Sequence, residues 1–216
     1  LFEGEGTHGS WDVARSGGPT VVRGSEDKPV GRGNRNGNPI GHSFKGYGDD
    51  GDLVAISADG NTIVSGSEDK TVRLWDRDGN PIGHPLKGHG HTVTSVAISA
   101  DGNTIVSGGS NYTVQLWNHN STLIGHPFKG HEGTVTSVAI SADGNTIVSG
   151  SYDRTVRLWN RDGTPIGHPF KGHREAVNSV AISADDNTIV SGSDDHTVRL
   201  WNRDGTPIGQ PFKGHG

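Results

Sequence analysis

The sequence contains neither cysteine nor methionine among its 216 residues. Without cysteine, thiol catalysis, disulfide bonds and cysteine-based zinc sites are excluded. The missing methionine leads us to expect a piece cut from a longer protein. No apolar run is long enough to span a membrane and no charged-then-apolar secretory leader is visible, so we expect no membrane partner and a cytoplasmic location.

The net charge is small, and apolar residues are few. The formal net charge is -5, with both signs interspersed, and the chain offers no basic patch that would make a nucleic acid an expected partner. Only 29% of the residues are hydrophobic, whereas 35 are glycine and 10 are proline, a composition that borders on that of disordered chains. The glycines and prolines recur at fixed offsets, however, as turn residues do in a folded repeat protein.

The chain consists of one 42-residue unit that occurs five times. The copies occupy residues 5–46, 47–88, 89–130, 131–172 and 173–214. The last two copies differ at eight positions, which leaves 34 of 42 identical, and the first copy is strongly eroded. A period near 40 predicts a propeller or solenoid, because one such unit cannot bury its apolar face without neighbours stacked on it. We therefore expect residues 1–216 to form a single domain.

Turn residues divide each unit into four short extended segments, which we name a to d. In residues 131–172 these segments are TVTSVAIS, TIVSGS, TVRLWN and PIGHPFKG, separated by ADGN, YDR and RDGT. Val, Ile, Thr and Trp fill the segments while Asp-Gly and Asn mark the breaks, as in antiparallel strands joined by hairpins. No segment has apolar residues at helical spacing. The predicted fold class is all-β, with four antiparallel strands in each repeat.

Two motifs at fixed places in the unit resemble those of the WD40 repeat family. Gly130-His131 lies where one unit meets the next, and the tryptophan of Trp159-Asn160 follows 28 residues after the histidine. The similarity is strong from residue 47 onward and weak before it. In detail the chain resembles bacterial arrays of recently amplified, near-identical repeats, which implies tandem duplication. The resemblance implies a WD40-type β-propeller in which each repeat supplies one four-stranded blade, five blades in all.

Each intact unit also repeats a His, a Ser, an Asp and a Trp at fixed offsets. The sets are His131, Ser149, Asp153 and Trp159; His173, Ser191, Asp195 and Trp201; His89, Ser107, Asn111 and Trp117; and Ser65, Asp69 and Trp75, with Tyr47 at the histidine position. Ser, His and Asp together could form a nucleophilic triad, but a catalyst needs one such group and this set recurs with its Trp. The resemblance implies a buried chain of hydrogen bonds from Trp through Ser and His to Asp. We interpret the sets as structural and expect no enzyme activity, catalytic residue or cofactor.

A second histidine series lies in segment d of each copy but the last. It comprises His42, His84, His126 and His168. One residue per blade around an outer edge cannot converge on a zinc ion, which needs three or four ligands at about 2 Å. We therefore expect no metal site.

The eroded first unit has lost the residues that make segment c a strand. Pro29 lacks a ladder donor, Gly31 and Gly33 weaken the segment, and Gly33 stands where Trp occurs in the other copies. We expect residues 5–36 to be irregular or partly disordered. If this unit stays outside the ring, two chains could each contribute four blades to one shared eight-bladed ring. Such a homo-oligomer is the alternative to a ring closed by the five blades of one chain.

Differences between the copies concentrate in the loop before segment a and in the corner between segments b and c. The candidate binding residues are Lys70, His91, Tyr112, Glu132, Tyr152, Arg154, Arg174, Glu175, Asp194 and His196. In a propeller blade the d–a and b–c loops emerge on the same face, which is the usual docking surface in the family. The leading prediction is a non-catalytic protein-interaction scaffold that binds an unknown protein or peptide there. Neutral drift of young repeats explains the pattern equally, and a multivalent carbohydrate-binding propeller is the alternative function.

Overall fold

The computed structural model describes residues 10–14, 20–25, 28–34 and 53–214. Every regular element in these ranges is a β-strand, from β1 to β18, which confirms the all-β prediction. Within the same ranges, no helix is present that would be long and apolar enough to cross a membrane.

The strands form five antiparallel sheets, each inside one sequence repeat, which we name blades 1 to 5. Blade 1 contains β1 (Ser10–Ala14), β2 (Thr20–Ser25) and β3 (Lys28–Asn34). Blade 2 contains β4 (Leu53–Ile56), β5 (Thr62–Gly66), β6 (Thr71–Asp76) and β7 (Pro81–Lys87), and blade 3 contains β8 (Val93–Ile98), β9 (Thr104–Gly109) and β10 (Val114–Asn118). Blade 4 contains β11 (Val135–Ile140), β12 (Thr146–Ser151), β13 (Thr155–Asn160) and β14 (Pro165–Lys171). Blade 5 contains β15 (Val177–Ile182), β16 (Thr188–Ser193), β17 (Thr197–Asn202) and β18 (Phe212–Lys213).

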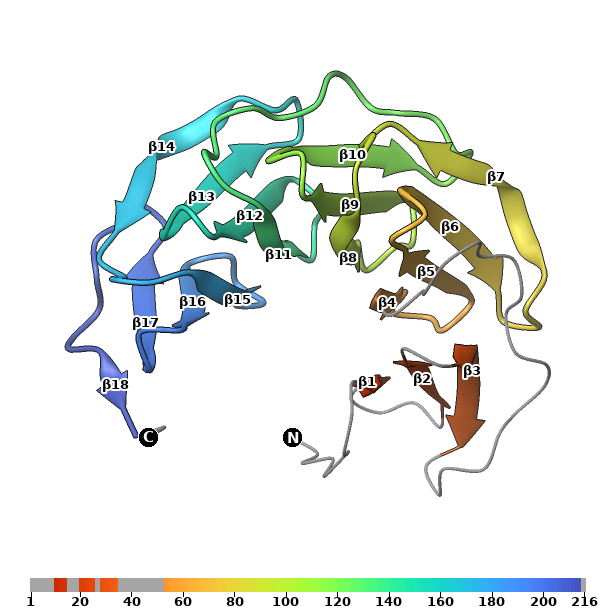
Figure 1. The fold of residues 1–216 in the computed structure, drawn as a ribbon, viewed down its shortest axis with the longest axis horizontal. Helices are drawn as coiled ribbons and strands as arrows, with labels where there is room; N and C mark the ends of the chain where they lie inside the picture. The colour runs from red at the N-terminus through yellow and green to blue at the C-terminus, as the bar shows by residue number, and fades with distance from the viewer. Residues whose placement is uncertain (1–9, 15–19, 26–27, 35–52, 215–216) are drawn as a thin grey trace.

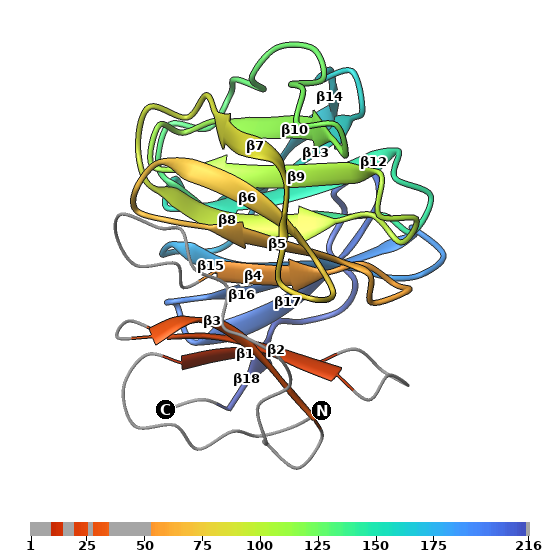
Figure 2. The ribbon, with the colours of Figure 1, turned by 90° about the vertical axis from the view of Figure 1, so that its right-hand side faces the viewer.

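The blades follow one another in chain order around a common centre, with the first strand of each blade innermost (Figure 1). Neighbouring blades pack through these inner strands, since β4 contacts β8, β8 contacts β11 and β11 contacts β15, while β1 and β2 lie against β4. Seen from the side, the sheets are stacked with their strands steeply twisted (Figure 2). Blades 1 and 5 stand on opposite sides of an opening, so the described strands form an arc rather than a closed ring.

The core lies between the blades, where the apolar face of one sheet packs on the next. Between blades 4 and 5, for example, Val148 and Leu158 share a buried cluster with Ile189 and Trp201. Close approach requires a small residue on one side, because a Cβ built on Gly150 would lie only 2.7 Å from a methyl group of Val177. The small residues of the repeat therefore allow blade-to-blade packing.

The prediction that residues 5–36 are irregular is wrong for the described part of blade 1, which contains three paired strands. The pairing of β2 with β3 shifts register between Arg23 and Ser25, opposite Gly31 and Lys28. Pro29 lies inside this irregularity, where a strand tolerates the loss of a backbone donor. The remainder of residues 5–36 lies outside the described residues.

The prediction of four strands in every blade is also wrong for blade 3, whose sheet has three strands. Two isolated bridges, Val114 with Phe128 and Trp117 with Leu123, mark the path of segment d. Between them Gly125 has a φ of 70°, but Gly83 and Gly167 have a φ of 68° within the intact strands β7 and β14, so this backbone conformation does not by itself end the strand. An outer segment has a ladder partner on one side only, so a local bulge interrupts it easily.

Candidate functional site

The repeated His, Ser, Asp and Trp side chains lie together in one hydrogen-bonded chain, as blade 4 illustrates. The indole Nε1 of Trp159 donates to Oγ of Ser149 at 2.8 Å, and Ser149 Oγ lies 2.7 Å from Nε2 of His131. Nδ1 of His131 lies 2.7 Å from Oδ2 of Asp153. The arrangement is satisfied when Ser149 donates to Nε2 and a neutral His131 donates from Nδ1 to the carboxylate.

Blades 3 and 5 repeat this geometry, with one change. In blade 5 His173 lies 2.8 Å from Ser191 and 2.9 Å from Asp195. In blade 3 Asn111 replaces the aspartate, and its Oδ1 lies 3.0 Å from Nδ1 of His89. The Asn111 amide also donates to the His89 carbonyl oxygen at 2.8 Å, so the loop remains tied to the corner without a charge.

Blade 2 retains the Trp–Ser link of the other blades. Trp75 donates to Ser65 at 2.7 Å, and Asp69 accepts from the backbone and side chain of Thr71. Tyr47, which stands at the histidine position, lies outside the described residues.

The pKa values of His89, His173, Asp153 and Asp195 are all lowered, although burial and hydrogen bonding act in opposite directions on each group. Burial lowers the pKa of His173, and the hydrogen bond with Asp195 offsets only part of that effect. Burial also lowers the pKa of His89. Burial alone would raise the pKa of Asp153, but the hydrogen bonds from His131 and Thr155 outweigh it and hold this pKa well below its ordinary value. His89 and His173 are therefore neutral, and Asp153 is ionised, at neutral pH.

The triad-like geometry is enclosed within the blades. Ser107 and Ser149 are 0% exposed and Ser191 is 1% exposed. Each serine oxygen also accepts a hydrogen bond from a tryptophan. A nucleophile must reach its substrate, and these oxygens have no open path to one, so the chain of bonds serves to connect strand c to the b–c corner and the d–a loop.

The ten predicted binding residues are all exposed, and they lie on one rim. This set comprises Lys70, His91, Tyr112, Glu132, Tyr152, Arg154, Arg174, Glu175, Asp194 and His196. Backbone hydrogen bonds join the two loops in blades 3, 4 and 5, as from Tyr152 to Thr134 in blade 4 and from Asp194 to Ala176 in blade 5. We call this surface the d–a/b–c rim.

The b–c corner presents one large side chain per blade from a left-handed backbone. Lys70, Tyr112, Arg154 and His196 have φ values of 71°, 66°, 69° and 61°. This conformation is uncommon for residues other than glycine, asparagine and aspartate. The corner therefore projects a side chain where glycine would relieve strain, and this residue differs among blades 2 to 5.

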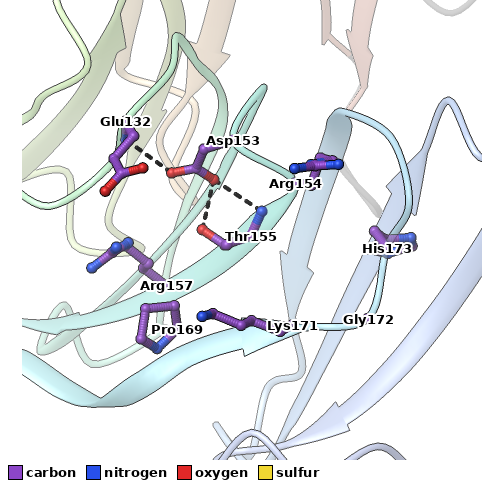
Figure 3. Close-up of a pocket in the computed structure, with 9 residues that line it drawn as sticks. All are labelled: Glu132, Asp153, Arg154, Thr155, Arg157, Pro169, Lys171, Gly172 and His173. Atoms are coloured by element: carbon purple, nitrogen blue, oxygen red, sulfur yellow. Dashed lines mark hydrogen bonds between the residues drawn. The ribbon is translucent and has the colours of Figure 1, made fainter.

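A hollow of about 360 Å³ opens on this rim where blade 4 meets the loop to blade 5. Its lining comprises Glu132, Asp153, Arg154, Thr155, Arg157, Pro169, Lys171, Gly172 and His173. Figure 3 shows Arg157 and Lys171 on one side of the hollow and Glu132 and Asp153 on the other. Both oxygens of Asp153 are occupied, since they accept from His131, from the Glu132 backbone and from Thr155. The three cations Arg154, Arg157 and Lys171 outnumber the carboxylates of Glu132 and Asp153 in the lining, which gives the hollow a net positive charge.

Sequence reasoning missed Arg157 and Lys171, because both belong to segments interpreted only as strands. The guanidinium carbon of Arg157 lies 6.0 Å from the centroid of the Trp159 ring, in position for a cation–π contact. Arginine recurs at this place in blades 2 and 5 and lysine recurs at the end of segment d. Charged residues inside a strand motif were the available signal. Within the described residues, no three potential metal-ligating side chains gather.

Four consecutive segments of the chain match one protein-family model. Residues 40–76, 79–118, 122–160 and 163–202 match the model described as WD domain, G-beta repeat. Each match ends on the residue after the segment c tryptophan, so it combines the outer segment of one blade with the first three strands of the next. The matched segments cover more than half of the chain. A comparison with curated proteins gave no match.

Proposed function

The chain belongs to the WD40 repeat family, whose repeats generally mediate protein interactions as scaffolds, and from this membership we propose that it is a non-catalytic scaffold that binds a protein or peptide on its d–a/b–c rim. Each of the five repeats supplies one blade in this proposal. The enclosed serines of the repeated network support a structural role for the only triad-like groups among the described residues.

The hollow beside Tyr152 is the observation that carries the proposal. The Tyr152 side chain is 60% exposed at the corner of blade 4, and tyrosine and arginine are the residue types that most often contribute binding energy in protein interfaces. Arg154, on the same corner, also lines the hollow. A rigid apolar ring next to a shallow positive depression suits a short peptide segment that carries a carboxylate.

The chemistry of the hollow favours an acidic ligand segment. Arginine can bind a carboxylate through two parallel hydrogen bonds. Three cations, Arg154, Arg157 and Lys171, line the hollow against two carboxylates, and the oxygens of one of these, Asp153, already accept hydrogen bonds from the protein. Long-range attraction by such cations raises the association rate and weakens with added salt.

A peptide-display selection tests the proposal. The 216-residue chain should select peptides with Asp or Glu, and the double variant Tyr152→Ala, Arg154→Ala should weaken their binding by about tenfold or more, because each residue contributes of order 1 kcal/mol. Arg161→Ala is the matched control, since Arg161 is an exposed arginine on the opposite rim, in the c–d turn.

Three results would contradict the proposal. The double variant could retain the selection profile of the unaltered chain, Arg161→Ala could weaken binding equally, or the selected peptides could lack acidic residues. Binding to a glycan array in place of peptides would favour the carbohydrate alternative, for which Tyr112 and Tyr152 are the exposed aromatic residues on the rim.

A further inference from the structure

Contacts between consecutive blades repeat the same residues at the same positions. The exit face of a blade, which contacts the following blade, is formed in blade 4 by Val148, Val156, Leu158 and Phe170. The entry face of the following blade is formed in blade 5 by Val177, Val180, Ile189 and Trp201. The corresponding residues form the contacts between blades 3 and 4 and between blades 2 and 3. Each of these side chains is at most 8% exposed, except Val96 of blade 3, which is partly exposed.

Blade 5 carries the same exit face with the side chains partly open to solvent. Phe212 is 56% exposed, whereas its equivalent Phe170 is 3% exposed. Val190, Val198 and Leu200 are partly exposed, although their equivalents in blade 4 are at most 1% exposed. The described residues leave this face uncovered, and it borders the opening between blades 1 and 5 (Figure 1).

The exit face also retains an open socket for a valine of the following blade. A Cβ built on Gly66, Gly108 or Gly150 would lie 2.6 to 2.7 Å from a methyl group of the valine that begins strand a of the next blade. At Gly192, the equivalent position in blade 5, the nearest atom is Ser179 Cβ at 3.9 Å. The socket is present in blade 5, and no valine fills it.

An entry face with its tryptophan is the complement of this surface, and the chain has four of them. Those of blades 3, 4 and 5 are covered by intact blades. The fourth belongs to blade 2, where Val54, Ile63 and Trp75 are buried on the side on which β1 and β2 lie. Blade 1 itself has Asp12 and Gly33 at the entry-face positions of Val180 and Trp201.

Blade 1 is a poorer match for the entry face of blade 2 than blade 5 would be. In the ladders of blades 4 and 5, Val148 pairs with Leu158 and Val190 pairs with Leu200. At the same position in blade 1, Val22 pairs with Arg32. The sequence thus has an arginine in blade 1 where blades 2, 3 and 4 each contribute a leucine to a buried contact, and a charged residue suits such a contact less well than leucine does.

From this comparison we propose that the exit face of blade 5 docks on the entry face of blade 2 of a second copy of the chain, where it takes the place of blade 1. The reciprocal contact between two copies gives a closed two-fold dimer with four intact blades from each chain. Leu200 and Phe212, which are partly or largely exposed in the single chain, become buried in this contact. The contact is separate from the d–a/b–c rim.

Light scattering after size exclusion tests the proposal over a concentration range of about a hundredfold, since dimers dissociate on dilution. The unaltered chain should have twice the monomer mass of 22.7 kDa at the highest concentration. Leu200→Arg, which copies the residue at position 32, should give only the monomer. Phe212→Asp should also give only the monomer. The monomer should still fold with this substitution, because the Phe212 side chain is 56% exposed in it.

Two further variants separate this arrangement from other dimers. Arg32→Leu improves the fit of blade 1 and should lower the dimer fraction, whereas Tyr152→Ala on the rim should leave it unchanged. A monomer at every concentration, a mass above that of the dimer, or a dimer that persists in both face variants would overturn the proposal. So would a dimer fraction that Arg32→Leu leaves unchanged or raises, because exchange with blade 1 would then play no part.

Discussion

Trp159 joins two kinds of stabilisation in one side chain. Its N–H donates into the hydrogen-bonded network of blade 4, and its ring lies 5.7 Å, between centroids, from Phe128 of blade 3. We expect Trp159→Ala to lower the free energy of unfolding by about 3–5 kcal/mol, through loss of a buried aromatic and of the serine's partner. Urea denaturation measures the change, and Tyr152→Ala, at an exposed position, should shift it by less than about 0.5 kcal/mol. Equal midpoints for the two variants would place the indole outside the core.

Buried histidines make the stability of the folded chain fall as the pH drops below about 6.5. The pKa values of His89 and His173 are lowered in the folded chain, so the unfolded chain binds these protons more readily. The stability that they provide is complete above the unfolded pKa of about 6.5 and falls as the pH drops below it. The lowered pKa values of Asp153 and Asp195 remove further stability below about pH 4.

Urea denaturation at about pH 7.5, 5.5 and 3.5 therefore should give successively lower free energies of unfolding. His89→Gln should reduce the difference between the two higher pH values. His168→Gln is the matched control, because His168 is exposed on an outer strand and Gln210 already stands at its place in blade 5. If the pH dependence of the unfolding free energy decreased in His168→Gln and not in His89→Gln, it could not be assigned to the buried histidine.

At the scale of the element, one turn residue distinguishes blade 5 from blades 2, 3 and 4. The a–b turns of blades 2, 3 and 4 have Gly60, Gly102 and Gly144 at φ values of 74° to 75°, whereas blade 5 has Asp186 at 59°. One carboxylate oxygen of Asp186 is also buried, with no hydrogen-bond partner in the described residues. Asp186→Gly should relieve both effects and stabilise the chain by about 1 kcal/mol, which raises Tm by about 2–4 °C in calorimetry. Gly144→Asp should lower Tm by a similar amount, and a decrease for Asp186→Gly would contradict the argument.

The elements that repeat could be predicted from the sequence, and those that depart from the repeat could not. Strands a to c of blades 2 to 5 follow from β-branched residues between Asp-Gly turns, and the order of contacts from Trp to Asp follows from the family resemblance. Pro29 and Gly33 predicted an irregular segment, yet ladder pairing and a bulge accommodate them in β3. Arg157 and Lys171 were missed because their approach depends on the pairing of β13 with β14, which no local pattern encodes.

On the scale of the whole molecule, each blade contributes a surface that only its neighbour completes. Stability in such an array is a sum of blade terms and nearest-neighbour contacts. Blade 4 has intact contacts on both sides, whereas blade 5 has one, and its exit face is partly exposed. The two blades share nearly the same sequence. A difference between their stabilities therefore reports the missing neighbour contact of blade 5 and not a difference in amino-acid composition.

Amide hydrogen exchange measures this difference without any substitution. Strands β12 and β16 have the same sequence, TIVSGS, and β13 and β17 share TVRLWN, so intrinsic exchange rates cancel in the comparison. We expect amides of β16 and β17 to exchange about ten- to a hundredfold faster than their equivalents, because a blade covered on one side opens at lower free energy. NMR is required, since peptides of identical sequence have identical masses. The experiment is done at a concentration where the chain is monomeric, and equal rates in the two blades would mean that the exit face of blade 5 is already covered within one chain.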